Sequence, residues 1–202
     1  MSKKAVLIRS LAGMLSVLAL ANISGAFSGA GSGTETDPYI ITNVNQLQEM
    51  ENDFAWYKLA NDIDCVVTRT WNGDGGTPEM FEGFKPIGSS INLFGGHFDG
   101  GGHKIIGLYI NDRLWMNGIG LFGGTDIDCE IKNVGLLDVD IAGKSHVGAL
   151  AGLNRGMITD CHCKGKVTDG GDLVGGLVGC NGYGATITDS YAVCTVTAGD
   201  NA

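Results

Sequence analysis

The chain has 202 residues, of which 34 are glycine and only 3 are proline, and 44% of its residues are hydrophobic. This composition is too apolar for a disordered chain and too rich in glycine for a helical domain. The formal net charge of −9 argues against a nucleic-acid partner, because the phosphate backbone requires clustered Lys and Arg side chains. The length and composition therefore favour one folded domain that is not built from helices.

The first 26 residues have the features of a signal peptide. Basic residues lie within residues 1–9, an apolar run LAGMLSVLALANI spans residues 11–23, and small residues occupy 24–26. A run of this length suits the apolar region of a removable signal and is short for a membrane span, although it could also form a buried core helix. We therefore predict that residues 1–26 are removed and that the protein is exported. Residues 27–36 would then form a flexible leader.

Residues 37–84 predict an N-terminal cap and the first strands. An amphipathic helix is expected over residues 44–54, because Leu47, Met50 and Phe54 are spaced for one apolar face. A single helix in front of a β-solenoid covers an open end, where unpaired strand edges would otherwise recruit another chain.

The chain from residue 85 to residue 202 is built from repeats. Copies of one block read INLFGG, IGLFGG, VGALAG and VGGLVG and begin at residues 91, 119, 147 and 174, at steps of 28, 28 and 27. A fixed period in this range marks a solenoid. Each period contains short apolar pieces separated by Gly, Asn and Asp, and it lacks the long amphipathic stretches of helical repeats. The sequence therefore predicts an all-β fold, a parallel β-helix with coils of about 27–29 residues.

Stacked coils place like residues above like and predict two structural columns. Glycine recurs at Gly120, Gly148 and Gly175, where it would allow a sharp bend or a close backbone approach that a Cβ atom would obstruct. Two residues beyond each block, a polar residue suits a turn ladder, because its side chain caps backbone groups and tolerates positive φ. The members of this expected ladder are Asp126, Asn154 and Asn181.

Two further matches give the expected register of neighbouring coils. Ile131, Ile158 and Ile187 are equivalent at steps of 27 and 29 residues. Residues 104–108 (KIIGL) match residues 132–136 (KNVGL) at a step of 28.

The chain resembles the bacterial secreted and surface proteins that carry the GLUG motif, named for a Gly-Leu-aliphatic-Gly core. That core is Gly176, Leu177, Val178 and Gly179, and residues 149–152 (ALAG) are a near copy. Segments 33–41, 84–88 and 94–103 are also similar to such proteins and extend the resemblance over roughly residues 31–202. The resemblance implies a right-handed β-helix at the cell surface or outside the cell, as in adhesin-like proteins. It carries over no catalytic motif.

Acidic pairs are candidate catalytic groups, because parallel β-helices also host polysaccharide lyases and hydrolases. Asp138 and Asp140 are two positions apart, which would place them on one strand face at roughly 7 Å, a separation that inverting glycosidases use. A solvated outer face explains the same alternation of polar and apolar residues without any activity.

A second candidate set combines His97, Asp99 and His103, which could supply acid–base chemistry. These residues lie in a turn-rich stretch of the first repeat. The 28-residue step places Thr125 and Ile131 opposite the two histidines, so neither histidine has a counterpart in the next copy. The catalytic residues therefore stay unknown, and the two sets are only candidates.

The even number of cysteines suggests disulfides in an exported chain. They are Cys65, Cys129, Cys161, Cys163, Cys180 and Cys194. A β-helix interior also accepts cysteine as a small apolar residue, so we expect one or two disulfides at most. Cys161 and Cys163 should share a face from which His162 points away, so we expect no zinc site, no other metal and no cofactor.

Two functions from different classes stay open. The repeats favour a non-catalytic extracellular module, an adhesin-like stalk or binding surface whose partner would be a glycan or a host or cell-surface protein. The alternative is a carbohydrate-active enzyme, a polysaccharide lyase or hydrolase, on the same scaffold. A further Gly-Leu-Val-Gly block would start at about position 204, so we expect a truncated array whose uncapped C-terminal coil self-associates.

Overall fold

A computed structural model describes residues 27–50, 54–72, 82–169 and 171–199. The predicted signal peptide, residues 1–26, lies outside these residues. Strands dominate the described part of the chain, which also contains the α-helix α1 (Val44–Gln48) and the 3-10 helix η1 (Val66–Thr70).

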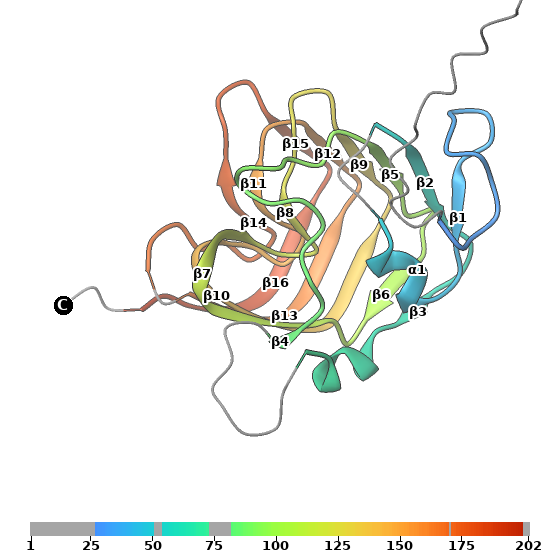
Figure 1. Cartoon of the computed structure of the whole chain (residues 1–202). Coiled ribbons are helices and arrows are strands. Elements are labelled where there is room, and N and C mark those ends of the chain that lie inside the picture. The colour runs from blue at the N-terminus through green and yellow to red at the C-terminus, as the bar shows by residue number, and fades with distance from the viewer. Residues whose placement is uncertain (1–26, 51–53, 73–81, 170, 200–202) are drawn as a thin grey trace, which may run out of the picture.

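The strands form three sheets, parallel except for one short pairing, around a common core (Figure 1). The first sheet has the order β1 (Tyr39–Ile41), β2 (Trp56–Leu59), β5 (His97–Asp99), β9 (Glu130–Lys132), β12 (Met157–Thr159) and β15 (Thr186–Thr188). The second sheet has the order β3 (Ile63–Asp64), β6 (Lys104–Ile106), β10 (Gly135–Val147), β13 (His162–Asp169) and β16 (Tyr191–Thr197). Alongside β10 it also contains β7 (Tyr109–Ile119), to which β4 (Glu82–Gly83) pairs antiparallel. The third sheet contains β8 (Phe122–Gly124), β11 (Ala151–Asn154) and β14 (Val178–Asn181).

Successive coils cross the three sheets in turn, so the predicted parallel β-solenoid is confirmed. Ile131, Ile158 and Ile187 pair across β9, β12 and β15 as their spacing predicted. At the following corner, Asn133, Asp160 and Asp189 have φ values of 55°, 53° and 50°. Asn and Asp tolerate this left-handed conformation better than other side chains do, so their recurrence turns each coil from the first sheet into the second.

The expected match of residues 104–108 with 132–136 was wrong. Ile105 pairs with Leu136, at a step of 31 residues. The difference arises in β7, where Asp112 pairs with Gly143 at a step of 31 but Asn117 pairs with Ser145 at a step of 28. β7 therefore contains three extra residues between Asp112 and Asn117. They raise the pairing step of the residues before them from 28 to 31, which the spacing of the glycine-containing blocks did not reveal.

The first glycine-containing block, residues 91–96, is also displaced from its expected position. Phe94 bridges to Thr125 instead of lying opposite Phe122, and Ile87 takes the place opposite Phe122. A turn separates these two bridges, with the Ser89 N–H donating to the Asn92 carbonyl at 2.7 Å. This inserted turn moves the block out of register with the next coil.

Helix α1 is shorter than predicted. Asn43 caps it by accepting a hydrogen bond from the Gln46 N–H at 3.0 Å, and Leu47 and Met50 are buried as expected. Phe54, however, lies outside the helix with 74% of its surface exposed. The helix ends at Gln48, whose side-chain amide pairs with both backbone groups of Lys85 at 2.8 and 3.0 Å. Contacts with a distant segment thus fix the helix end, as is common for a helix this short.

Residues 27–36 have defined partners, whereas a flexible leader was expected. The Phe27 ring packs on Tyr39 at 4.7 Å between centroids. The Ser28 backbone and hydroxyl both donate to the Glu49 carboxylate, at 2.8 and 3.0 Å. The Ala30 carbonyl accepts from the Ile40 N–H at 2.8 Å. The segment therefore occupies the outer edge of β1, which would otherwise be open for pairing.

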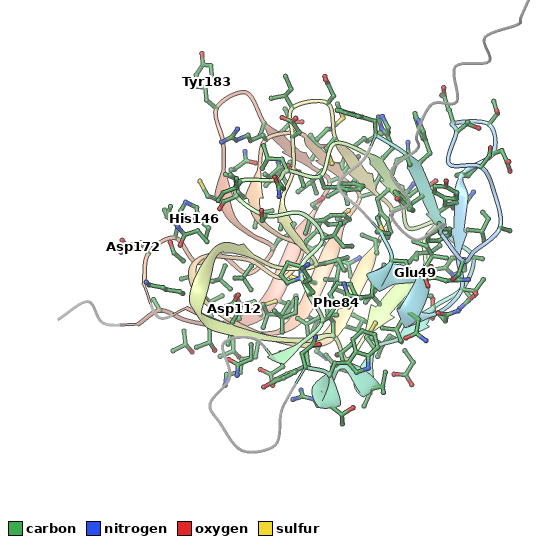
Figure 2. All side chains as sticks on the ribbon, viewed as in Figure 1. Glu49, Phe84, Asp112, His146, Asp172 and Tyr183 are labelled. Atoms are coloured by element: carbon green, nitrogen blue, oxygen red, sulfur yellow. The ribbon has the colours of Figure 1, made fainter. Side chains whose placement is uncertain are left out.

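The N-terminal half of the core is aromatic. Phe94 and Phe98 pack on Phe122 with ring centroids 5.1 and 5.5 Å apart, and all three side chains are buried. Phe84, which lies in the body of the molecule in Figure 2, stacks on Trp71. Towards the C-terminus smaller residues take equivalent interior positions, as where Ala151 pairs with Phe122, and Ile187 and Val196 in the last described coil are partly exposed.

The repeated glycines lie where neighbouring backbones come close together. A Cβ atom on Gly120 would meet the Gly148 carbonyl oxygen at 2.5 Å, and one on Gly148 would meet the Gly179 nitrogen at 2.6 Å. Neither contact is sterically possible, so only glycine fits these two positions without a shift of the coils.

Candidate functional site

The outer face of the first sheet carries a cluster of aromatic and charged side chains, here called the histidine cluster: Trp56, His97, Glu130 and Lys132. Strand register creates it, because Trp56 pairs with His97 and His97 pairs with Glu130 on three successive strands. The Trp56 and His97 rings stack with centroids 3.8 Å apart and planes inclined by 15°. The sequence comparison missed Glu130, because the shifted register makes it, and not Thr125, the counterpart of His97.

Glu130 lies next to both of the other ionisable side chains in the histidine cluster. Its Oε2 lies 3.0 Å from Lys132 Nζ and 3.8 Å from His97 Nδ1. Roughly a quarter to a third of each of these side chains is exposed, so solvent screens the pairs and each contributes little to stability. The arrangement presents one aromatic stack and both signs of charge to solvent, which suits binding through several weak polar contacts.

The other members of the histidine-based catalytic set have separate partners. Asp99 Oδ1 accepts from the Asn133 side-chain amide at 3.0 Å and from the Gly101 N–H at 2.8 Å. His103 Nδ1 lies 3.4 Å from Asp62 Oδ1, a contact between neighbouring coils. Asp99 thus holds a turn, His103 contacts a neighbouring coil and His97 stacks on Trp56, and the structure shows no hydrogen bond or ion pair between any two of these three described residues.

The pair Asp138 and Asp140 does not form the two-carboxylate face that the spacing predicted. The register shifts between Leu137 and Val139, so Asp138 bulges out with a φ of 53°. Asp140 remains in the ladder and accepts from the Arg69 guanidinium at 3.1 Å. Because a bulge inserts one residue, the alternation of faces on which the prediction depended is broken at Asp138.

An open hollow of about 400 Å³ lies over the last two coils of the second sheet. Its lining residues are Asp138, Lys164, Gly165, Ala192, Val193, Cys194 and Thr195. Asp138 and the basic Lys164 both line this hollow, whereas the other catalytic candidates do not.

The turn ladder runs through a different residue from the one predicted. Thr125 Oγ1 donates to Asn154 Oδ1 at 2.9 Å, and Asn154 Nδ2 donates to Asn181 Oδ1 at 2.8 Å. Asp126 instead accepts from the Ile127 N–H within its own turn. The reason is a one-residue difference between coils: Phe122 pairs with Ala151 at a step of 29, not 28.

A cluster of Ser145, His146 and Asp172, which the sequence did not reveal, joins two coils, and Figure 2 shows His146 and Asp172 at one edge of the molecule. Ser145 Oγ lies 3.0 Å from His146 Nδ1 and donates to the Asp172 backbone carbonyl at 3.1 Å. The His146 N–H donates to the same carbonyl at 3.1 Å. These bonds join adjacent coils through the backbone of Asp172, so the cluster has a structural role.

The cysteines are thiols, and burial dominates their chemistry. Desolvation raises the pKa of Cys65 to about 12 and that of Cys161 to about 11, and it raises the pKa of Cys129 further. Cys161 and Cys163 are buried, whereas His162 stacks on Tyr191 with ring centroids 5.3 Å apart. Within the described ranges, no group of three or more His, Cys, Asp or Glu side chains is placed to hold a metal ion.

None of the helices that the structure describes has the length and apolar character needed to cross a membrane.

Comparison with known proteins identifies one repeat. Residues 170–197 match the family model of the GLUG motif. A crystal structure of a candidate immunoglobulin A1 protease from Bacteroides ovatus is also similar, with 17% identity over 83% of this chain and 69% of that chain. Its TM-score is 0.45, which is too low to support an argument about function.

Two curated relatives extend the similarity beyond that repeat. Over 160 residues the chain is 34% identical to halomucin from Haloquadratum walsbyi, covering 74% of this chain and 2% of halomucin. Over 141 residues it is 36% identical to a candidate Gly-rich membrane protein from Evansella cellulosilytica, covering 67% of this chain and 15% of that protein. The chain thus spans only a small part of either relative. It carries the GLUG motif, and the resemblance drawn from its sequence is confirmed.

Proposed function

We propose that the chain is a non-catalytic module of a surface or secreted protein, in which stacked coils form an adhesin-like stalk or binding surface. The observation that carries this proposal is the alignment with halomucin, in which 74% of this chain corresponds to 2% of the relative. A solenoid whose coils contact only their neighbours suits such a role, because it can be inserted into a long protein as a self-contained unit.

The contacts of the candidate catalytic residues support the same proposal. Asp140 is paired with Arg69, Asp99 with Asn133, and His103 lies beside Asp62. Each of these contacts joins different coils or fixes a turn. The stacking of coils therefore explains the positions of these residues, and no catalytic role is needed to account for them.

For the binding partner we propose a glycan that contacts the histidine cluster. Saccharides present apolar ring faces and many hydroxyls, which match an aromatic stack flanked by Glu130 and Lys132. Glycan-array binding of the purified protein should be lost in Trp56→Ala and retained in Tyr183→Ala, whose side chain is fully exposed on a loop tip (Figure 2). Equal binding by both variants would reject the histidine cluster as the site.

The last coil offers a surface for a second copy of the chain. Ile187 and Val196 pair with the buried Ile158 and Val167, yet 37% and 43% of their surfaces are exposed. The opposite end is covered by residues 27–36, so two copies would meet C-terminal coil to C-terminal coil in a twofold contact. Sedimentation should show association that rises with concentration and is weakened in Val196→Thr. The matched variant Val66→Thr, on η1 at another surface, should not change it, and a monomer at all concentrations would reject the contact.

Export of the chain belongs to the same proposal. Protein isolated from the cell envelope or medium should begin near Phe27, because residues 1–26 have the pattern of a removable signal. An exported protein that retains Met1 or Ser2 would contradict it.

The carbohydrate-active alternative is tested directly by polysaccharide cleavage. The purified protein is incubated with a panel of acidic and neutral polysaccharides, and new reducing ends and unsaturated products are measured. We expect neither. Cleavage that disappears in Asp138→Asn/Asp140→Asn or in His97→Gln/Asp99→Asn would establish the enzyme instead.

A further inference from the structure

We propose that Cys163 and Cys194 are an oxidative modification site, at which a disulfide joins the last coil to the coil before it. The two Sγ atoms lie 3.1 Å apart, closer than an ordinary contact between two sulfur atoms. A disulfide bond is about 2.05 Å long, so bond formation requires an approach of about 1 Å. No other pair of thiols in the described part of the chain makes such a contact.

The register of β13 and β16 explains how the two thiols meet. Cys163 pairs with Ala192, and Cys194 pairs with Gly165, so the cysteines are diagonal neighbours on adjacent strands. The two cysteines are offset by two positions along the paired strands, yet their side chains reach across this offset so that the sulfur atoms meet.

Gly176 keeps the space beside the two thiols open. The Gly176 carbonyl oxygen lies 3.0 Å from Cys163 Sγ. A Cβ atom at Gly176 would lie 3.4 Å from the Cys194 Cβ and 2.8 Å from the Ala192 Cβ. The bare backbone of Gly176 in the GLUG core thus leaves room for the two thiols.

The two thiols differ in accessibility, which sets the order of reaction. Cys194 is partly exposed, whereas Cys163 is buried, and its burial raises the pKa of the Cys163 thiol. Since the thiolate is the attacking species, Cys194 reacts first with an external disulfide, either a small-molecule disulfide or that of a thiol oxidoreductase.

The reaction then has two exchange steps. The Cys194 thiolate attacks one sulfur of the external disulfide, forms a mixed disulfide and releases one thiolate. Cys163 loses its proton, attacks the Cys194 sulfur and releases the second thiolate. Two protein thiols are oxidised to one disulfide, and the external disulfide is reduced to two thiols.

The first test locates the bond. The full chain in a Cys180→Ser background, which removes the other partly exposed thiol, is incubated with oxidised glutathione, alkylated and digested. Mass spectrometry should find a peptide pair linked through Cys163 and Cys194 and lighter by two hydrogens. Free, alkylated Cys163 and Cys194 in protein whose circular dichroism is native would overturn the proposal, as would a link to another cysteine.

The second test separates the two steps. In the same background, Cys163→Ser should retain glutathione as a stable mixed disulfide on Cys194, whereas Cys194→Ser should retain none. Cys161→Ser is the matched control, because this buried thiol lies two positions away and should leave the link unchanged. Glutathione retained equally by Cys163→Ser and Cys194→Ser would contradict the assigned order.

The third test measures what the bond does. Limited proteolysis within residues 171–199 should be several-fold slower in the oxidised protein than in the reduced protein. Gly176→Ala should slow formation of the link, because its Cβ atom crowds Cys194 and Ala192. A cleavage rate that does not depend on oxidation would show that the bond does not fasten the last coil.

Discussion

The two ends of the solenoid are built differently. At the N-terminal end, residues 27–36 cover the edge of β1, and Ile41, Tyr57 and Leu59 are almost fully buried. At the other end, the inward positions of β15 and β16 are open: Ile187 and Val196 are partly exposed although their neighbours one coil earlier are fully buried. Figure 1 shows these ends on opposite sides of the molecule.

This difference shows that burial in a solenoid comes from the coils on either side and not from the coil itself. Ile158 and Ile187 have the same side chain, the same register and the same strand type. Ile158 lies between two neighbouring coils, whereas the described residues place a coil on only one side of Ile187. This difference decides whether the side chain is buried. Among the described coils, each side chain therefore depends on the coils that pack directly against it, as expected for nearest-neighbour coupling.

The largest expected effect compares the two isoleucines. Ile158→Ala should lower the free energy of unfolding by about 2–5 kcal/mol, the usual cost of removing a buried Ile side chain. Ile187→Ala should cost less than half as much, because its side chain is already 37% exposed. Urea unfolding followed by circular dichroism measures both. Equal losses would contradict an open last coil.

The next effect compares two glycines of the repeat. Gly148→Ala should lower stability by about 3 kcal/mol, because its Cβ atom would collide with the backbone of the neighbouring coil, which cannot move independently. Gly176→Ala should cost about 1 kcal/mol, since its Cβ atom meets only side chains of the open last coil. The thermal midpoints of the two variants provide the comparison. A larger loss at Gly176 would show that the last coil is the more rigid one.

The turn ladder gives a third comparison. Asn154→Ala should cost about 2 kcal/mol, because it removes a buried side chain that bonds to both Thr125 and Asn181. Asn181→Ala should cost less than about 1 kcal/mol, since Asn181 is exposed and Asn154 retains a bond to the Gly156 carbonyl. The denaturant midpoints of the two variants measure this difference. If Asp126→Ala proved more costly than Asn154→Ala, the ladder assigned from the sequence would have to be restored.

The smallest effect is expected at the covered end. Glu49→Ala removes the acceptor of two hydrogen bonds from Ser28 and should cost about 0.5–1 kcal/mol. Amide exchange at Ile40 should become faster, because its acceptor Ala30 is held less firmly. The exposed Glu35 in the same segment provides a control, and Glu35→Ala should leave the exchange rate unchanged. An unchanged rate in both variants would mean that the Glu49 contact does not hold residues 27–36.

The sequence was sufficient for the fold class and for the register of the later coils. Ile131, Ile158 and Ile187 recur at steps of 27 and 29 and pair as predicted, because stacking like side chains over like is what the repeat preserves. The alternation of faces at Cys161, His162 and Cys163 was also predicted correctly, because successive side chains of a strand point to opposite faces. The corner residues Asn133 and Asp160 carried a readable signal too, since their residue types tolerate positive φ.

Insertions limited the prediction of the candidate site. The three extra residues of β7 raise the step from 28 to 31, and two further residues between Thr125 and Glu130 raise it to 33, so Glu130 was not recognised opposite His97. The bulge at Asp138 broke an alternation that spacing alone supports. The close approach of Cys163 and Cys194 arises from the pairing of β13 with β16, a property of two strands together that neither sequence segment shows.

The ladder of Thr125, Asn154 and Asn181 also gives the stack of coils a direction that each coil has to match. Each member donates towards the C-terminal side, and the amide of Asn181 donates to the Ala185 carbonyl in its own coil. A coil inserted into this series must both accept from the coil before it and donate to the coil after it. Asparagine, threonine and serine can do both, whereas an aspartate can accept but cannot pass a proton donor onward. The residue type at the ladder position therefore restricts which coils can stack at that place in the series.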